Sequence, residues 1–410
     1  MHDDHKPVTV LHTSDWHLGR RLYGRTRHQE FSAFLDWLAG TIADRAVDAL
    51  LVAGDVFDTA SPGNRSQEQY YRFLCRVAGT SCRHVVIIAG NHDSASFLDA
   101  PSELLKALHI HIVASPGEQP SDEVLPLIGP DGKVELIVCA VPYLRERDVR
   151  QVESGESLED KERKYREGVQ RHYEAVVSEA MRQRELHGGR VPVAAMGHLF
   201  AAGGKSLADD GVRDLYVGSL AHISAAVFPD ELDYVALGHL HVPQMVTNSH
   251  TIRYSGSPLP MGFGEAGQTK EVCLVTFGAA GTEVETLPVP LFQELKRIRG
   301  DWEQISFQIT GLAERDSSAW LEIIYEGREL VADLRDRVDG AVAETRLEFL
   351  RISNARLSEQ VLGQEHPGQA LADLDINEVF ARCLDAHDVP DEQRPELLRA
   401  YAETLESLYE

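Results

Sequence analysis

The sequence has few cysteines, no long apolar run and a shortage of positive charge. Its five cysteines are scattered and form no Cys-x-x-Cys pair, which excludes a disulfide framework and favours a reducing cytoplasm. No apolar run reaches the length of a membrane span, and the polar N-terminus lacks the apolar core of a secretory signal. The 40 basic and 65 acidic residues give a net charge of -25, so nucleic-acid binding requires a local basic patch or a partner.

Short apolar runs alternate with helical patterns through the first part of the chain. The runs predict buried strands over residues 8–12, 49–53, 84–89, 134–141, 192–196 and 234–237. Apolar spacing predicts helices over residues 31–46 and 68–78, and the charged segment 145–190 predicts one or two solvated helices. This order indicates an α/β fold around a buried sheet.

The pattern changes after about residue 287. We expect strands over residues 306–311, 320–325 and 347–354, with a helix at 330–343, which together make a small α+β domain. A linker and two acidic amphipathic helices follow, and these helices either dock on a basic partner or pack on their own domain. The expected domains are 1–286, 287–358 and a helical tail at 370–410.

Polar motifs follow five of the expected strands. They are Asp15-Trp16-His17, Gly54-Asp55, Gly90-Asn91-His92-Asp93, Gly197-His198 and Gly238-His239-Leu240-His241. In open α/β sheets, ligands bind beyond the carboxyl ends of the strands. One such motif is weak evidence, because a lone strand-end histidine is usually structural, but five in order indicate a metal site.

The side chains in these motifs are oxygen and imidazole donors, which suit manganese, iron, zinc or cobalt. They exceed what one ion with an open position needs, so we expect two divalent ions that share an anionic bridge, most naturally Asp55. A water between two such ions loses its proton near neutral pH and attacks phosphorus. His92 need not bind metal and is free to reach the scissile phosphate or to protonate the leaving oxygen. The candidate ligands are Asp15, His17, Asp55, Asn91, His198, His239 and His241.

A cluster of arginines follows the first motif. We expect this loop to contact DNA phosphates beside the metals through Arg20, Arg21, Arg25 and Arg27. The alternative is a solvated loop that precedes a helix. Histidines outside the motifs, such as His12 and His84, are expected to be structural.

Five phrases resemble the calcineurin-like metallophosphoesterases, and more closely the SbcD family, the nuclease subunits of bacterial SbcCD complexes. They are LHTSDWHLGR (11–20), VAGDVFDTASP (52–62), IIAGNHDS (87–94), DYVALGHLH (233–241) and YSGSPLPMGFGEA (254–266). The resemblance is strong over the first domain and is limited to layout beyond it. It implies a four-layered α/β metallophosphoesterase sandwich with a small α+β capping domain that contacts DNA and partner-binding C-terminal helices.

The resemblance also implies the chemistry and the partners. One metal would be held by Asp15, His17, Asp55 and His241, and the second by Asp55, Asn91, His198 and His239. It implies manganese as the ion, His92 as the catalytic histidine, exonuclease action on duplex ends and endonuclease action on single strands and hairpins. It further implies a homodimer within a heterotetramer, an SMC-like ATPase partner of the SbcC type, and a role in DNA repair and recombination.

One position differs among relatives. Archaeal and eukaryotic members tend to carry a second active-site histidine just after the Gly-Asp motif, where this sequence has Asp58, as bacterial members do. The role of Asp58 therefore stays open. Two other functions also remain open, a phosphoesterase acting on small phosphodiester or phosphomonoester substrates, and a non-enzymatic subunit with a decayed site. The arginine loop and the extra domain favour the nuclease, and the complete ligand set disfavours decay.

Overall fold

The computed structural model describes residues 7–150, 156–201, 223–327 and 333–354, together with Arg394 and Tyr401. The chain divides into two compact units, Met1–Leu295 and Lys296–Glu410. The predicted linker lies outside the described residues, and so do the acidic terminal helices apart from Arg394 and Tyr401. Within those residues, no helix combines the length and the apolar character that crossing a membrane requires.

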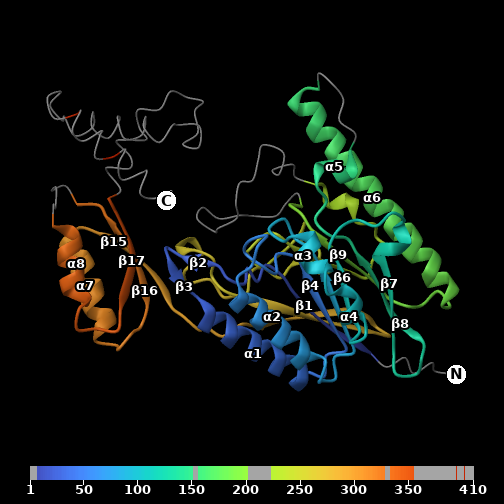
Figure 1. Ribbon diagram of the computed structural model, residues 1–410, viewed down its shortest axis with the longest axis horizontal. Coiled ribbons are helices and arrows are strands. Elements are labelled where there is room, and N and C mark those ends of the chain that lie inside the picture. The colour runs from blue at the N-terminus through green and yellow to red at the C-terminus, as the bar shows by residue number, and fades with distance from the viewer. Residues whose placement is uncertain are drawn as a thin grey trace. The chain divides into compact units, whose positions relative to one another are not determined.

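The first unit contains two six-stranded sheets (Figure 1). The first sheet has the order β14-β13-β1-β4-β5-β6 and consists of β1 (Val8–Thr13), β4 (Ala49–Ala53), β5 (His84–Ile88), β6 (Ile110–Val113), β13 (Glu271–Gly278) and β14 (Gly281–Pro288). Strands β1, β4, β5 and β6 are parallel to one another. Strand β13 pairs with β1 in the antiparallel direction. Parallel strands buried on both faces explain the unbroken apolar runs of β4 and β5.

The second sheet has the order β11-β12-β10-β9-β8-β7. Its strands are β7 (Val124–Ile128), β8 (Val134–Ala140), β9 (Val193–His198), β10 (Tyr234–Gly238), β11 (Gln244–Met245) and β12 (Ile252–Tyr254). The four strands β12, β10, β9 and β8 run parallel, whereas β11 and β7 pair antiparallel at the edges. The sheet therefore has a parallel centre, as the first sheet does.

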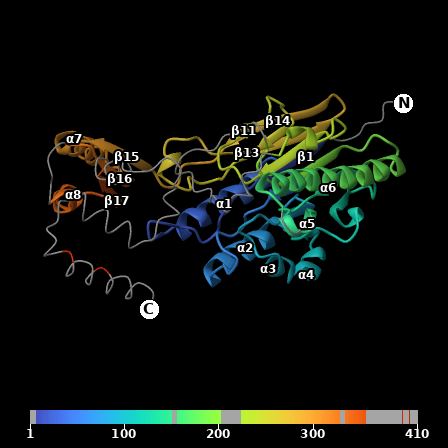
Figure 2. The same ribbon diagram turned by 90° about the horizontal axis from the view of Figure 1, so that it is seen from above.

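Helices cover the outer faces of the two sheets, which gives four layers (Figure 2). The longer helices α1 (His28–Asp44) and α2 (Asn64–Val77) pack on the first sheet, and α6 (Leu158–Leu186) packs on the second. Small apolar residues such as Ala53, Ala140 and Ala194 fill the layer between the sheets and let them approach closely. The shorter elements are α3 (Ala95–Asp99), α4 (Ser102–Lys106), α5 (Glu146–Val149), η1 (Pro120–Glu123), η2 (Ala225–Val227) and η3 (Phe263–Glu265).

Helix α6 corrects part of the interpretation of segment 145–190. The segment is helical as predicted, but one face is not solvated. Val169, Tyr173, Val176 and Val177 are buried at helical spacing against the second sheet. The segment was interpreted as solvated because its overall composition is highly charged. The charged residues lie on the other face of the helix, so composition alone does not show the apolar stripe.

The described part of the second unit is a three-stranded sheet with two helices, and it contains one wrong prediction. Its elements are β15 (Leu295–Gly300), α7 (Trp302–Ala313), β16 (Trp320–Tyr325), α8 (Leu334–Val342) and β17 (Glu348–Asn354). The strand expected at 306–311 is part of helix α7. Phe307 is 81% exposed, whereas Ile305, Ile309 and Leu312 are buried at helical spacing. A capping box from Asp301 and Gln304 starts the helix.

Candidate metal centre

The five polar motifs converge at one edge of the two sheets. Asp15 and His17 follow β1, Asp55 follows β4, and Asn91 and His92 follow β5, all neighbouring strands of the first sheet. His198 ends β9, while His239 and His241 follow β10, the adjacent strand of the second sheet. The shared direction of these parallel strands brings all the predicted ligands to their carboxyl ends.

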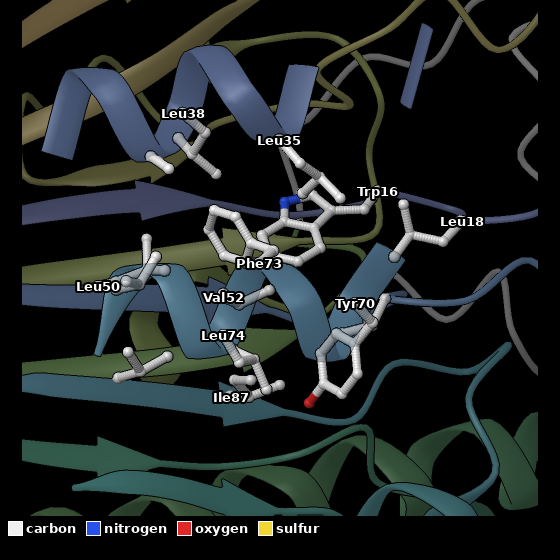
Figure 3. Close-up of a cluster of buried hydrophobic side chains, with 14 of the residues drawn as sticks. Trp16, Leu18, Leu35, Leu38, Leu50, Val52, Tyr70, Phe73, Leu74 and Ile87 are labelled. Carbon is white, nitrogen blue, oxygen red and sulfur yellow. The ribbon is translucent and has the colours of Figure 1, made fainter. Parts of the chain in front are cut away.

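Trp16 anchors the first motif to the helical layer. Its indole is fully buried and packs edge-on against Phe73 of α2, with ring centroids 5.3 Å apart, and against Phe34 of α1 at 6.1 Å. Its Nε1 donates to the Thr13 hydroxyl at 3.0 Å. Figure 3 shows Trp16 among side chains from α1 and α2. This packing holds Asp15 and His17, the predicted ligands on either side of the tryptophan, at the carboxyl end of β1.

The ligand loops have an unusual backbone. Asp15, His17, Asp55 and His239 have φ values of 52°, 48°, 50° and 100°, in the left-handed region that side chains rarely adopt. Each such residue costs on the order of 1–3 kcal/mol. Hydrogen bonds between the loops keep the conformation, since Asp15 N donates to Gly54 O and His17 N donates to Asp55 O, both at 3.0 Å. Strain of this kind at four of the predicted ligands is typical of a functional site.

Glycines precede the ligands because the loops approach closely. A Cβ on Gly90 would lie 2.1 Å from Asp55 Oδ1, and a Cβ on Gly54 would lie 2.3 Å from His198 Nδ1. Gly54 also has a φ of +88°. These two positions therefore admit only glycine if Asp55 and His198 are to stay where they are.

Asp93, which sequence reasoning did not assign, ties two motifs together. Its buried carboxylate accepts hydrogen bonds from Val56 N at 3.1 Å, Phe57 N at 3.0 Å and Gly90 N at 2.9 Å. Burial and the charge of Asp55 raise the pKa of Asp93 to about 6. The carboxylate fixes the turns that carry Asp55 and Asn91 relative to each other.

All seven predicted ligands lie in one cluster, with Asp55 at its centre. Asp55 Oδ2 lies 3.6 Å from His17 Nε2 and 3.4 Å from His198 Nε2. On one side, His17 Nε2 is 3.1 Å from His241 Nε2, and Asp15 is close enough to join them around one ion. On the other side, Asn91 Oδ1 lies 2.9 Å from His198 Nε2 and 3.0 Å from His239 Nδ1.

The charges in the cluster suit a cation. Burial opposes the charge on Asp55, but the neighbouring His198 and His17 outweigh it and hold the pKa of Asp55 well below its usual range. For His198, burial is likewise outweighed, here by the Asp55 charge, and its pKa rises to about 9. Burial lowers the pKa of His17, and burial together with His198 lowers that of His239 to about 3. The donors fit divalent ions, which compete with the protons that these side chains would otherwise hold.

His92 lies beside this cluster. Its backbone N donates to Asp55 Oδ1 at 2.9 Å, and its ring lies 4.8 Å from that of His17. Its Nδ1 is 2.8 Å from the carbonyl oxygen of Asp58. Because a carbonyl only accepts, Nδ1 carries the proton and Nε2 is left for other partners.

The arginine segment is a short hairpin rather than a loop. Strands β2 (Arg21–Leu22) and β3 (Arg25–Thr26) pair in the antiparallel direction around Tyr23 and Gly24, both of which have positive φ. The Tyr23 ring is 47% exposed and stacks on Phe263 at 5.8 Å.

The four arginines divide into two pairs. Arg21 and Arg25 are exposed. Arg20 is half-buried and donates to Asp58 Oδ1 at 3.1 Å. Arg27 is buried, holds both oxygens of Glu30 and donates to Pro260 O at 2.6 Å. Arg27 is therefore not available to a phosphate, and we remove it from the expected DNA contacts.

The cluster of metal-binding side chains and the layered sheets indicate a metallophosphoesterase, and comparison with known families agrees. The model described as calcineurin-like phosphoesterase matches residues 8–243. A second model, described as the type 5 capsule protein repressor C-terminal domain, matches residues 291–388. A dimetal phosphatase from Danio rerio aligns over 69% of this chain and 99% of its own, at 13% identity and a TM-score of 0.35.

Relatives extend the match over the whole chain. The SbcD subunit of the nuclease SbcCD from Escherichia coli K12 is 34% identical over 98% of each chain. The SbcD subunit from Bacillus subtilis is 34% identical over 77% of this chain and 78% of its own, and that from Rhodobacter capsulatus is 35% identical over 69% of each. The chain belongs to the calcineurin-like phosphoesterases and, within them, to the SbcD family. It is thus a phosphoester hydrolase.

Proposed function

We propose that this chain is the nuclease subunit of an SbcCD-type complex, a metal-dependent enzyme that cuts DNA in repair and recombination. Its reactions would be exonucleolytic on duplex ends and endonucleolytic on single strands and hairpins. The observation that carries the proposal is the convergence of seven oxygen and imidazole donors on one sheet edge around Asp55. The names of the relatives, similar along 98% of the chain in Escherichia coli, support DNA as the phosphodiester substrate.

Two divalent ions, with manganese as the proposed metal, fit the donor set. Asp15, His17, Asp55 and His241 would hold one, and Asp55, Asn91, His198 and His239 the other. When bound, such ions activate water for attack on phosphorus and offset the charge on the phosphate oxygens.

The residues of the chain supply position and proton transfer. Asp55 faces both groups of histidines, so its carboxylate sets the spacing between them. His92 presents Nε2, because its Nδ1 proton is donated to Asp58 O. From there a protonated Nε2 can hydrogen-bond a phosphate oxygen and donate a proton to the leaving oxygen. Loss of such a proton donor costs roughly 10²–10⁴ in rate.

DNA would be held next to this edge by the exposed side of the hairpin. Arg21 and Arg25 are the proposed phosphate contacts, and Arg20 is a weaker candidate because it already pairs with Asp58. The domain at 287–358 is proposed to cap and contact DNA. The tail at 370–410, of which only Arg394 and Tyr401 are described, is proposed to dock on an SMC-like ATPase of the SbcC type. We also propose a homodimer within a heterotetramer and a cytoplasmic location.

The test is cleavage of end-labelled linear duplex and of hairpin-ended duplex by the purified chain. Reactions would contain manganese, magnesium or chelator, with Asp55→Asn and His92→Ala as matched variants. We expect manganese-dependent DNA cleavage that both variants lose. Hydrolysis of a bis-aryl phosphodiester with no DNA cleavage, even after addition of the ATPase, would instead favour the small-substrate enzyme.

A further inference from the structure

Two histidines on the Asp15 side of the metal centre share one arrangement. The Nε2 atoms of His17 and His241 meet at 3.1 Å, so both face the same point. The opposite nitrogen of each ring, Nδ1, lies 3.5 Å from a carboxylate oxygen, Asp58 Oδ1 for His17 and Glu265 Oε1 for His241. We propose that Asp58 and Glu265 are positioning residues that keep the proton of each imidazole on Nδ1 and leave both Nε2 lone pairs for the metal.

Glu265 is held rigidly for this role. It is completely buried, and its Oε2 accepts from Met261 N at 3.1 Å, from the Ser257 hydroxyl at 3.3 Å and from Lys270 Nζ. These donors all meet Oε2, and Oε1 has no hydrogen-bond partner of ordinary length among the described residues. Glu265 Oε1 therefore faces Nδ1 of the His241 ring. A buried acceptor left without a donor costs about 1–3 kcal/mol, so a proton on His241 Nδ1 is favoured.

Lys270 completes the group. Its side chain is 4% exposed, and besides Glu265 it donates to the Ser257 hydroxyl at 3.1 Å and to the carbonyl oxygen of His241 at 3.0 Å. The same cation thus neutralises the carboxylate and fixes the backbone of the ligand that the carboxylate faces. A buried carboxylate needs such a partner, because an unpaired buried charge is strongly destabilising.

Asp58 acts on His17 in the same way and also reaches His92. Its carboxylate is held by Arg20 at 3.1 Å, while its backbone oxygen accepts the proton of His92 Nδ1 at 2.8 Å. His17 Nδ1 is buried and has no shorter hydrogen bond among the described residues than this approach to Asp58. Neutral imidazole has one donor nitrogen and one acceptor nitrogen, so an anion at Nδ1 selects the tautomer with an open Nε2. Partners of this kind orient metal-binding histidines and raise their basicity.

The inference rests on the proposed metal site and is tested by metal binding rather than by cleavage. Mn²⁺ is titrated calorimetrically into the metal-free full-length chain and into Asp58→Asn and Glu265→Gln. We expect wild type to bind two ions and each variant to bind one of them about 10–100-fold more weakly, the usual cost of losing such a partner. ¹⁵N-histidine spectra of the metal-free chains report the tautomers directly, and we expect the Nδ1–H signature of one histidine to change in each variant.

A matched control separates positioning from general damage. Glu123 is another buried carboxylate, 2.9 Å from His172 Nε2 and away from the cluster, so Glu123→Gln should leave Mn²⁺ affinity unchanged. If Glu265→Gln fails to fold because Lys270 is left unpaired, Glu265→Gln with Lys270→Met removes both charges and carries the same expectation. Wild-type affinity and unchanged histidine spectra in folded Asp58 and Glu265 variants would overturn the inference. Failure of wild type to bind Mn²⁺ would instead overturn the proposed metal site.

Discussion

The two sides of the metal centre use different partners behind their histidines. On the Asp15 side, His17 and His241 have carboxylates at Nδ1. On the Asn91 side, His198 Nδ1 donates to the neutral carbonyl oxygen of Ala53 at 2.9 Å, whereas the Nδ1 of His239 faces the proposed ligand atom Asn91 Oδ1 at 3.0 Å and is therefore its metal-facing nitrogen. A carboxylate raises the basicity of an imidazole more than a neutral carbonyl does. We therefore expect the Asp15 side to bind its ion more tightly and the Asn91 side to release its ion first.

The shared carboxylate provides the largest test of this comparison. Asp55 Oδ2 lies within 3.6 Å of a histidine on each side, so Asp55→Asn should weaken both ions and remove the difference between them. We expect DNA cleavage to fall by at least about 1,000-fold, at the upper end for loss of a preorganised electrostatic group. Cleavage assays over a manganese series, with calorimetry, measure both effects. Retention of one tight ion would show that Asp55 does not serve both sides.

A change confined to one side should separate them. Asn91 Oδ1 lies within 3.0 Å of His198 and His239, the histidines of its own side, so Asn91→Ala should weaken one ion by roughly 10–100-fold and leave the other unchanged. The measurement is a Mn²⁺ titration that resolves two classes of site. Equal weakening of both classes would contradict the division into two sides.

The site was largely predictable because parallel strands carry their polar ends to one edge. That rule brought together the seven proposed ligands and His92 without any distance. It could not find Asp58 or Glu265, whose relation to His17 and His241 depends on how loops meet in three dimensions. Glu265 lies in the quoted phrase that ends at Ala266, but nothing in its spacing shows that it faces His241.

Two errors have local causes that the sequence did contain. Arg27 was assigned to DNA because it belongs to an arginine cluster that follows the first metal motif, yet Glu30 stands three residues later on the first turn of α1, where an ion pair is expected. Segment 306–311 was predicted as a strand, although Asp301 and Gln304 form a helix start signal. In both cases an interaction with a side chain three residues away determined the structure, Arg27 with Glu30 and Asp301 with Gln304.

Phosphate contacts should be independent of both metal sides. Replacing Arg21 and Arg25 with alanine should weaken DNA binding and reduce the slope of log K against log salt by about 0.9 for each lost phosphate contact. Mn²⁺ affinity should stay at the wild-type value, because neither guanidinium belongs to the cluster. Arg27→Met is the matched control, since it should reduce stability without a change in slope. An unchanged slope in the double variant would exclude the hairpin as the phosphate contact.

His12 gives the smallest effect and a reference for what a carboxylate does to a buried histidine. His12 and His198 are both wholly buried, but burial lowers the pKa of His12 to about 3, whereas Asp55 overcomes burial at His198 and raises its pKa to about 9. His12 has the Tyr234 hydroxyl, 2.9 Å from its Nδ1, instead of an acid.

Between pH 6.5 and about 3 the unfolded chain binds a proton at His12 that the folded chain refuses, so stability falls as the pH falls through this window. His12→Gln retains a partner for Tyr234 and cannot take up that proton. We expect wild type to lose about 0.8 kcal/mol relative to the variant between pH 8 and pH 6, and more below. Urea unfolding in chelator, where metal does not contribute, measures the difference. Parallel pH profiles for the two chains would mean that His12 takes up its proton as readily in the folded chain as in the unfolded chain. Burial would then not lower the pKa of His12.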